Sequence, residues 1–205
     1  MIEKFSVDHL SELAAYACRK NASRESGSAF CCQTEASIQR DFSETLDFGF
    51  ACREGDRLCG LLSCFPDLEK GNVDCALLAD RENYSATARK LLSAAQAQLG
   101  NHLRYTFFFP KENEACAAFL ESIGACRREN EYRMVLRRDD WQPQEGLPAP
   151  HPLEEAAYAA FVALHDRVFP DVYVSGRDIL EDLGKSRFVY TLEEAGSLAA
   201  YGVLH

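Results

Sequence analysis

The chain has 205 residues, of which 47% are hydrophobic and 11% aromatic, and this composition is typical of a folded globular protein. Its 22 lysines and arginines stand against 32 aspartates and glutamates, which gives a net charge of -10. That balance argues against nucleic acid or an anionic membrane surface as a main partner, because both require a basic surface. It would suit a cationic or amine substrate, although acidic charge also serves solubility alone.

The sequence shows no targeting or membrane signal. No segment reaches the ~18 apolar residues of a membrane span, and "MIEKFSVDHL" lacks the basic and apolar regions of a signal peptide. Nine cysteines lie between Cys18 and Cys126 without a C-x-x-C pair, mostly in apolar stretches such as "RLCGLLSCF". We therefore expect reduced cysteines that pack as small hydrophobic side chains, a cytoplasmic location and no disulfide framework. The five histidines show no metal-ligand spacing.

The first half of the chain predicts a strand, two helices and a run of strands. "MIEKFS" is a short strand, and the apolar period over residues 7–20 predicts a helix. Residues 34–46 predict a second helix with Thr34 as its N-cap. Residues 48–65 predict a hairpin that turns at Glu54-Gly55-Asp56, and residues 72–80 predict an apolar central strand.

The next elements alternate between helix and strand. The pattern predicts a helix over residues 85–99, a buried strand over 104–109, a helix over 112–124 that stops at Gly124, and a closing strand over 131–138. The order over residues 1–138 is therefore β-α-α-β-β-β-α-β-α-β. We expect an α/β (α+β) domain with a mixed, mostly antiparallel sheet flanked by helices.

A proline-rich linker over residues 139–152 separates this domain from a second unit. Residues 153–205 predict two helices and two strands around Glu194-Ala195-Gly196, which repeats the α-α-β-β start of the first domain. A sheet of this kind would have an open edge and an uncovered apolar face. We expect that a further segment or another chain completes the second unit.

Three stretches carry a resemblance to a known family. They are "DCALLAD" with "RENYSATARKLL", "RYTFFF" with "KENEACAAFLESIGA", and "EYRMVL". The second matches the pattern N-x-x-A-x-x-[LF]-Y-E-x-[LI]-G-F at Asn113, Phe119, Glu121, Ile123 and Gly124. In these features the chain resembles the GNAT superfamily of N-acetyltransferases, in a tandem form with a degenerate N-terminal domain and an incomplete second domain.

The resemblance implies transfer of an acetyl group from acetyl-CoA to a small-molecule or peptide amine, without a covalent enzyme intermediate. In this family the backbone at a helix N-terminus holds the CoA pyrophosphate, and the strand before that helix splays from its neighbour. The positions of this sequence that match the CoA-binding residues are Leu78, Asp80, Asn83, Tyr84, Ser85, Ala86, Thr87, Ala88 and Asn113.

The sequence departs from the family pattern where the chemistry is most demanding. Ala86 stands in place of a glycine, and Asn83 in place of arginine or glutamine. Leu120 occupies the position of the tyrosine that protonates the departing thiolate, and leucine cannot donate a proton. We therefore predict a non-catalytic first domain. The alternative interpretation of residues 83–88 is an ordinary helix start that Asn83 or Ser85 caps.

Other candidate residues have an ordinary structural explanation as well. Asn113 is expected to cap its helix, and Tyr84 is expected at the surface. In the second unit, the region that lines the acceptor cleft in the family holds His165, Asp166, Phe169, Pro170, Tyr173 and Ser175. The alternative there is a helix that ends before a proline turn, with Phe169 and Tyr173 in the core. Trp141 is expected to anchor the linker.

Two further functions stay open. A non-enzymatic GNAT-fold scaffold, which mediates dimerisation into a homodimer or presents an acceptor cleft, would explain the missing glycine and tyrosine. A small-molecule binder of another class that shares only the fold is the other alternative, because a fold does not determine a function.

Overall fold

The computed structural model describes residues 1–28, 34–127, 146, 149–170 and 174–204. The chain divides into two compact units, Met1–Asn130 and Glu131–His205. The predicted closing strand over 131–138 and Trp141 lie outside the described residues, as does most of the predicted linker.

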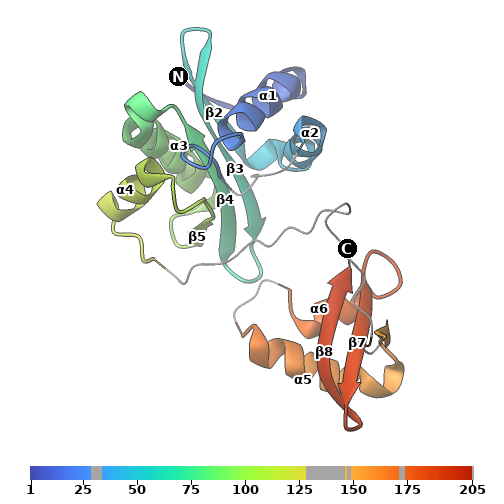
Figure 1. Ribbon diagram of the computed structural model, residues 1–205. Coiled ribbons are helices and arrows are strands. Elements are labelled where there is room, and N and C mark those ends of the chain that lie inside the picture. The colour runs from blue at the N-terminus through green and yellow to red at the C-terminus, as the bar shows by residue number, and fades with distance from the viewer. Residues whose placement is uncertain (29–33, 128–145, 147–148, 171–173, 205) are drawn as a thin grey trace. The chain divides into compact units, whose positions relative to one another are not determined.

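The first unit is built on one five-stranded sheet in the order β1-β2-β3-β4-β5 (Figure 1). Its strands are β1 (Ile2–Lys4), β2 (Gly49–Glu54), β3 (Arg57–Asp67), β4 (Asn72–Ala79) and β5 (Arg104–Phe107). Each neighbouring pair is antiparallel except β4 and β5, which are parallel. The mixed, mostly antiparallel sheet that the sequence predicts is confirmed. The expectation of a buried β5 is wrong, because Arg104 is exposed and the rest of the strand is only half-buried at the end of the described sheet.

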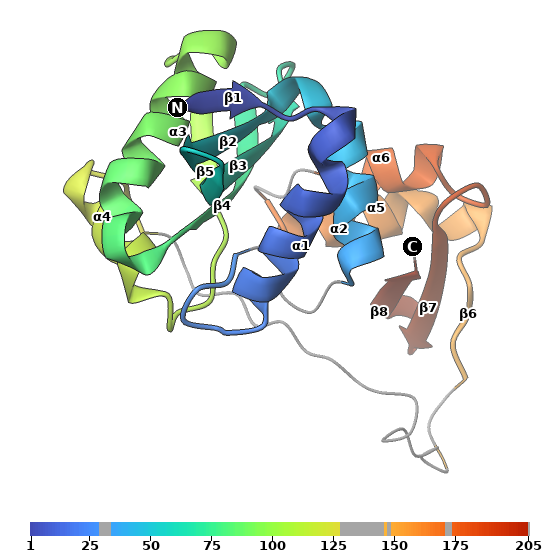
Figure 2. The ribbon, with the colours of Figure 1, turned by 90° about the horizontal axis from the view of Figure 1, so that it is seen from above.

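Helices cover both faces of this sheet (Figure 2). One face carries α1 (Leu10–Asn21), which follows the short 3-10 helix η1 (Val7–His9), and α2 (Glu35–Glu44). The other face carries α3 (Tyr84–Leu99) and α4 (Glu114–Ser122). Thr34 caps α2 as predicted, because its side chain accepts a hydrogen bond from the backbone N–H of Ser37 at 3.2 Å.

The sheet separates two hydrophobic cores, and alternation along the strands assigns side chains to each. In β4, Cys75 and Leu77 pack toward α3 and α4, whereas Ala76 and Leu78 pack toward α1 and α2. Burial on both faces explains why the sequence of β4 is almost continuously apolar. The strand therefore holds its C-terminal end rigidly between the two helical layers.

The hairpin of β2 and β3 turns where the sequence predicts. Gly55 has a φ of 61°, a left-handed conformation that glycine adopts without strain. The register shifts by one residue between Cys52 and Arg53, and Glu54 then pairs with Arg57. The extra residue of this bulge is Cys59 on β3. Alternation along β2 puts Arg53 on the same face as Ala51, toward α1.

The second unit has a three-stranded sheet in the order β6-β7-β8. Its elements are β6 (His151–Pro152), the 3-10 helix η5 (Glu155–Ala157), α5 (Tyr158–Val168), α6 (Gly176–Glu181), β7 (Phe188–Glu194) and β8 (Ser197–Leu204). Its core contains Leu153, Phe161, Ile179 and Val189.

The two units share one hydrogen-bonding pattern. In the first, the β2–β3 register shifts after Cys52 and resumes with Arg53 opposite Leu58. In the second, the β7–β8 register shifts after Leu192 and resumes with Glu193 opposite Leu198. Both hairpins then close through a two-residue turn, and both have a short N-terminal strand paired antiparallel to their first long strand. The repeat of the α-α-β-β order therefore extends to strand register.

One face of the second sheet is exposed within the described residues. Phe188 pairs with Leu204, and their side chains are 51% and 59% exposed. Tyr190, two residues along β7, is exposed as well. The equivalent β2 residue of the first unit, Phe50, is buried in the core that α3 covers. In the repeated pattern, this face is thus the one that a helix covers in the first unit.

Arg53 ties three parts of the first unit together. Its Nε donates to Glu3 of β1 at 2.6 Å, and its two terminal nitrogens donate to the Glu12 carboxylate of α1. It also donates to the backbone oxygen of Asp56 in the hairpin turn at 3.0 Å. The hydrogen bond from Arg53 lowers the pKa of Glu12 below its ordinary value of 4.5.

Because of this ion pair, we expect the first unit to lose stability in acid. Because the folded-state pKa of Glu12 is lower than its unfolded value, the ion pair stabilises fully above pH 4.5 and is lost as pH falls through the folded value. We expect Glu12→Gln to flatten the fall of the unfolding free energy of the first unit below pH 4.5. Denaturation at a series of pH values measures this slope. Glu44→Gln, at an exposed position on α2, is the matched control and should leave the slope unchanged; equal slopes in all three proteins would contradict the prediction.

Candidate functional site

The strands β4 and β5 separate at the C-terminal end of the sheet. Their parallel pairing runs from Asn72 opposite Arg104 to Cys75 opposite Phe107. β4 continues to Ala79, and in the described structure its last residues pair with β3 alone. An opening between these two strands is the feature in which the family resemblance would seat the arm of CoA.

Asn113, at the start of α4, joins two parts of the first unit. The residue is completely buried, and its side-chain amide donates to the backbone oxygen of Gly27 at 2.8 Å. Its side-chain oxygen accepts from the backbone N–H of Cys116 at 3.0 Å, so Asn113 caps α4 as predicted. Gly27 belongs to the segment that follows α1, on the opposite face of the sheet from α4. A single side chain thus joins the two helical layers.

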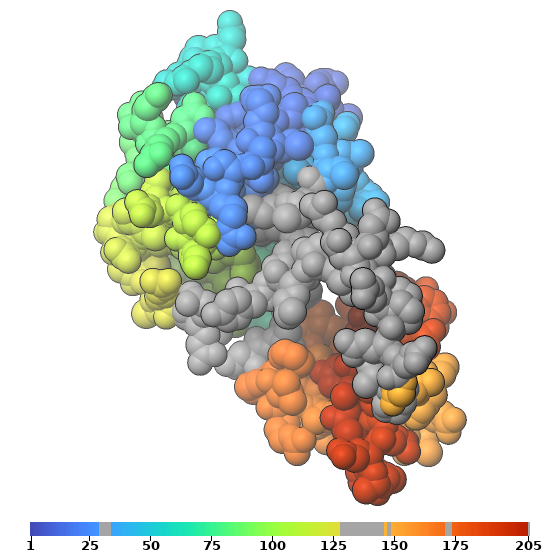
Figure 3. Space-filling model, viewed as in Figure 1, coloured from blue at the N-terminus to red at the C-terminus, as the bar shows by residue number. Residues whose placement is uncertain are grey.

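We call residues 22–28 the strap, because they cross from α1 toward the starts of α3 and α4. Beside the Asn113 contact, Arg24 pairs with Glu112 at 3.0 Å and Glu25 pairs with Arg81 at 3.7 Å. Both ion pairs are exposed and contribute little on their own. In Figure 3 the blue atoms that follow α1 lie against the yellow-green atoms before α4. The strap therefore connects the end of α1 to the segments that precede α3 and α4.

Tyr84 lies inside the molecule, so the expectation of a surface position is wrong. Its side chain is 5% exposed and belongs to the core between the sheet, α3 and α4. α3 begins at this residue, and Tyr84, Ala88, Leu91 and Ala95 form the inward stripe of the helix. That spacing, visible in the sequence, would have predicted the burial. The hydroxyl lies near Cys116 and has no hydrogen-bond partner among the described residues, and burial raises its pKa above the ordinary value.

The remaining residues of the predicted pyrophosphate loop point in different directions. A 3-10 turn, η3 (Arg81–Asn83), leads into α3, and the Asn83 side chain makes no capping hydrogen bond. Ser85 and Ala86 are exposed on the first turn. Thr87 and Ala88 are buried, and a Cβ at Gly60 would lie 2.5 Å from the Thr87 methyl. Only the exposed part of this turn could meet a ligand.

Two other predicted positions lie in the cores. Leu78 is completely buried toward α1 and α2, so it could offer a ligand only its backbone. Leu120 is 9% exposed and packs in the core on the α3 and α4 side. At this position of the motif "AFLESIG" the side chain therefore makes apolar contacts in the core. Gly124, which ends the motif, has a φ of 76°, as expected for a residue that follows a helix end.

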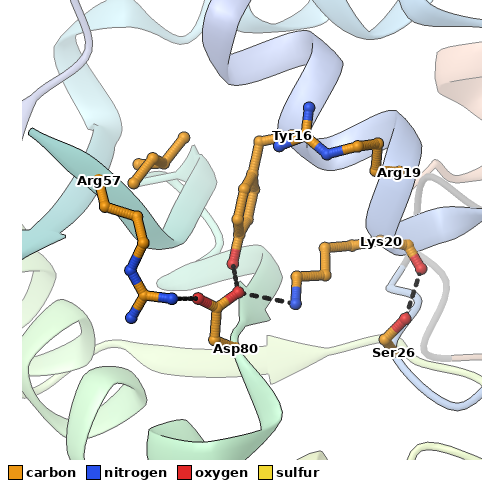
Figure 4. A pocket seen from close by; sticks show the side chains of 7 residues that line it. Tyr16, Arg19, Lys20, Ser26, Arg57 and Asp80 are labelled. Atoms are coloured by element: carbon orange, nitrogen blue, oxygen red, sulfur yellow. Dashed lines mark hydrogen bonds and ion pairs between the residues drawn. The ribbon is translucent and has the colours of Figure 1, made fainter.

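Asp80, the residue after β4, organises a polar hollow of about 450 Å³ (Figure 4). Its carboxylate accepts from the Tyr16 hydroxyl at 3.1 Å and lies 2.8 Å from Lys20 Nζ and 3.3 Å from the Arg57 guanidinium. The hollow is lined by Tyr16, Arg19, Lys20, Ser26, Arg57, Leu58 and Asp80. Burial, reinforced by the negative charge of Asp80, raises the pKa of Tyr16, so its hydroxyl stays protonated and donates.

The sequence singled out Asp80 only as a position that matches a CoA-binding residue of the family, and it predicted neither this hollow nor the residues around Asp80. Tyr16, Arg19 and Lys20 lie at helical spacing on the last turns of α1, so one face of that helix presents all three. Arg57 begins β3, and antiparallel pairing brings it beside the end of β4. The helical spacing was visible in the sequence, whereas the approach of α1 to the end of β4 was not.

In the second unit, His165 is a buried structural residue. Its Nε2 donates to the backbone oxygen of Val174 at 2.9 Å, which leaves Nδ1 to accept from the Tyr201 hydroxyl at 2.7 Å. Asp166 accepts from the backbone N–H of Gly176 at 2.8 Å. Ser175 forms a capping box with Asp178 at the start of α6. These predicted cleft residues thus fix α5 to its neighbours.

In the same region, Phe169 does not lie in the core, where the structural alternative places it. Phe169 is 49% exposed, so its expected core position is wrong. It lies at the end of α5, where its ring reaches only His165, with 5.4 Å between ring centroids. Pro170 is exposed, and Tyr173 lies outside the described residues.

Within the described ranges, no cluster of histidine, cysteine and acidic side chains could hold a metal ion. In the same ranges, each helix is too short or too polar to cross a membrane. All cysteines within the described ranges are free thiols.

We expect removal of the hydroxyl to change the unfolding free energy in opposite directions at the two buried tyrosines. Tyr84→Phe removes a buried hydroxyl without a partner, so we expect the unfolding free energy of the first unit to rise by about 1 kcal/mol. Tyr16→Phe removes a hydrogen bond to Asp80, so we expect a fall of about 1.5 kcal/mol. Hydrogen exchange of β4 and α3 amides measures both values, and a loss of stability in Tyr84→Phe would show that its hydroxyl has a partner.

No family model and no curated protein matches this chain. Among solved structures, it is similar to an acetyltransferase of the GNAT family from Streptococcus pneumoniae, at 15% identity and a TM-score of 0.45 over 60% of this chain and 83% of that one. A Thermus thermophilus protein is similar at 13% identity and a TM-score of 0.44, over 67% and 97% of the two chains. A transcriptional regulator from Bacillus halodurans is similar at 13% identity and a TM-score of 0.44, over 66% of this chain and 99% of that one. At these identities the likeness is one of fold.

Proposed function

We propose that the protein is a GNAT-type N-acetyltransferase that transfers an acetyl group from acetyl-CoA to a small-molecule or peptide amine, and that its first unit does not carry the transfer. The observation that carries the second part is Leu120, which packs in the core on the α3 and α4 side at the position where the resemblance implies a proton-donating tyrosine. The first part rests on the sequence motif, whose ends have clear structural roles at Asn113 and Gly124.

The chemistry supports a non-catalytic first unit. When an amine attacks a thioester, the departing thiolate needs a proton donor and the carbonyl needs a polarising N–H group. Leu120 can donate no proton, and the Tyr84 hydroxyl is held inside the core. The exposed N–H groups near Ser85 and Ala86 could still meet a phosphate, but a bound thioester would find no proton donor at Leu120.

The repeated strand register supports a tandem arrangement. The second unit reproduces the β1-α1-α2-β2-β3 part of the first unit, including the bulge and the two-residue turn. We place the working acetyl-CoA site of the protein in this second domain. Its exposed apolar face at Phe188 and Leu204 is where an equivalent of α3 would pack. The free, mostly buried cysteines of the first unit suit a reducing cytoplasm.

A non-enzymatic scaffold is the second candidate. The core position of Leu120 favours it for the first unit, and the exposed face of the second sheet offers a surface on which two copies could form a homodimer. Under this alternative, the whole protein would acetylate no amine.

Titration calorimetry with acetyl-CoA tests the proposal for the first unit. We expect the first unit to bind acetyl-CoA no more tightly than the high-micromolar range, because Leu120 and Tyr84 are packed in its core and the loop lacks the family glycine. Ala86→Gly restores the family glycine but leaves Leu120 and Tyr84 in the core, so it should gain no affinity. Ala97→Gly, at an exposed position of α3, is the matched control for the ~1 kcal/mol that a glycine costs within a helix.

Acetyl-CoA binding by the wild-type chain that a charge at the first-unit loop, in Ala86→Asp, abolishes would overturn the proposal of a non-catalytic first unit, whereas binding that Ala86→Asp leaves unchanged belongs to the second unit. A gain of affinity in Ala86→Gly alone would show that the missing glycine is what prevents binding by the first unit. Mass spectrometry of small-molecule and peptide amines incubated with acetyl-CoA and the protein separates the two candidates, because only the enzyme produces acetylated amines.

A further inference from the structure

The hollow at Asp80 has a charge opposite to that of the chain. Three cationic side chains line it, Arg19, Lys20 and Arg57, whereas Asp80 is its only carboxylate among the described residues. The chain as a whole has a net charge of -10. A local excess of positive charge in a concave site attracts anions and raises their local concentration.

The ion pairs in the hollow leave cationic groups available. Asp80 is shared between Lys20 and Arg57, and Arg57 also pairs with Glu54 outside the hollow at 2.9 Å. Within the described structure Arg19 is in no ion pair, and its guanidinium lies 5.8 Å from the centre of the Tyr16 ring. At the rim, Arg81 and Glu25 offset each other. One carboxylate therefore does not neutralise the cations that face the hollow.

The geometry also suits an anion. Lys20 and Asp80 are only 22% and 19% exposed, so charges there are less screened than on the open surface. The terminal nitrogens of Arg57 pair with Glu54 and Asp80, and its side chain is 57% exposed, so an oxyanion would compete with these carboxylates for its N–H groups. The 16-residue helix α3 begins four residues after Asp80, and its N-terminal dipole adds positive potential to that side.

We propose that this hollow is a binding site for a phosphate monoester carried by a small organic molecule. A phosphate monoester has a charge of about −1.5 to −2 at neutral pH, which matches the excess of cations. The phosphate would contact Arg19, Lys20 and Arg57. The volume of about 450 Å³ leaves space for an organic part against Leu58 and the Tyr16 ring.

Substitution of Asp80 tests the proposal, because the proposal predicts that its removal makes phosphate esters bind more tightly. The carboxylate competes with the phosphate for Lys20 and Arg57 and repels it. Asp80→Asn keeps an oxygen that can accept from Tyr16 but removes the negative charge, so we expect phosphate esters to bind about tenfold more tightly. If the cluster served only to fix α1 to β4, the same substitution would loosen the structure without creating affinity.

Calorimetry in a phosphate-free buffer provides the measurement, with glycerol 3-phosphate and inorganic phosphate as probes. We expect glycerol 3-phosphate to bind more tightly than inorganic phosphate, and Lys20→Ala or Arg57→Ala to weaken it about tenfold. Lys90→Ala, at an exposed position of α3 outside the hollow, is the matched control and should bind as the wild type does. Hydrogen exchange of α1 and β4 amides verifies that each variant is folded.

Three results would overturn the proposal. They are no binding of either probe by wild type and Asp80→Asn, weaker binding in Asp80→Asn, and equal losses in Lys20→Ala and Lys90→Ala. Tighter binding of inorganic phosphate than of the ester would overturn the organic part of the assignment. The outcome is separable from that of the proposed function, because neither probe contains a thioester and the β4–β5 opening plays no part in this binding.

Discussion

The hydrogen bond from Asn113 to Gly27 is the contact on which the candidate site depends. It joins the start of α4 to the strap that follows α1, and these elements cover opposite faces of the sheet. The bond is completely buried, so the loss of either partner would leave an unsatisfied polar group in the core. The same side chain caps α4 through the backbone N–H of Cys116, so Asn113 fixes both the helix start and the strap.

The end of β4 has two sides with different chemistry. On the α3 and α4 side, Tyr84 and Leu120 fill the interior with apolar contacts and one unpartnered hydroxyl. On the α1 side, Asp80 gathers Tyr16, Lys20 and Arg57 around a hollow. The burial of the first side argues against acyl transfer in this unit. The polarity of the second side leaves a place where a charged small molecule could bind.

The repeat relates the two units through backbone geometry more than through side chains. The β2–β3 and β7–β8 hairpins share a bulge and a two-residue turn, although Gly55-Asp56 in one corresponds to Ala195-Gly196 in the other. Backbone twist and register can persist while side chains change, because the ladder is formed by main-chain groups. The exposed Phe188 face is explained by this repeat, since its counterpart in the first unit lies under α3.

The sequence by itself determined the order of the first unit's elements up to α4, the mixed sheet, the N-caps at Thr34 and Asn113, and the turns at Gly55 and Gly124, because these depend on local periodicity and backbone preference. It also singled out Asp80 and the missing proton donor at Leu120. It missed β6, which lies at the end of the predicted linker. Only the tertiary structure decided that Tyr84 is buried, that Asn113 reaches Gly27, and that α1 brings Tyr16 and Lys20 to Asp80. These contacts join residues 60 or more positions apart in the chain. Packing between layers sets them, and no local pattern encodes the distance between two layers.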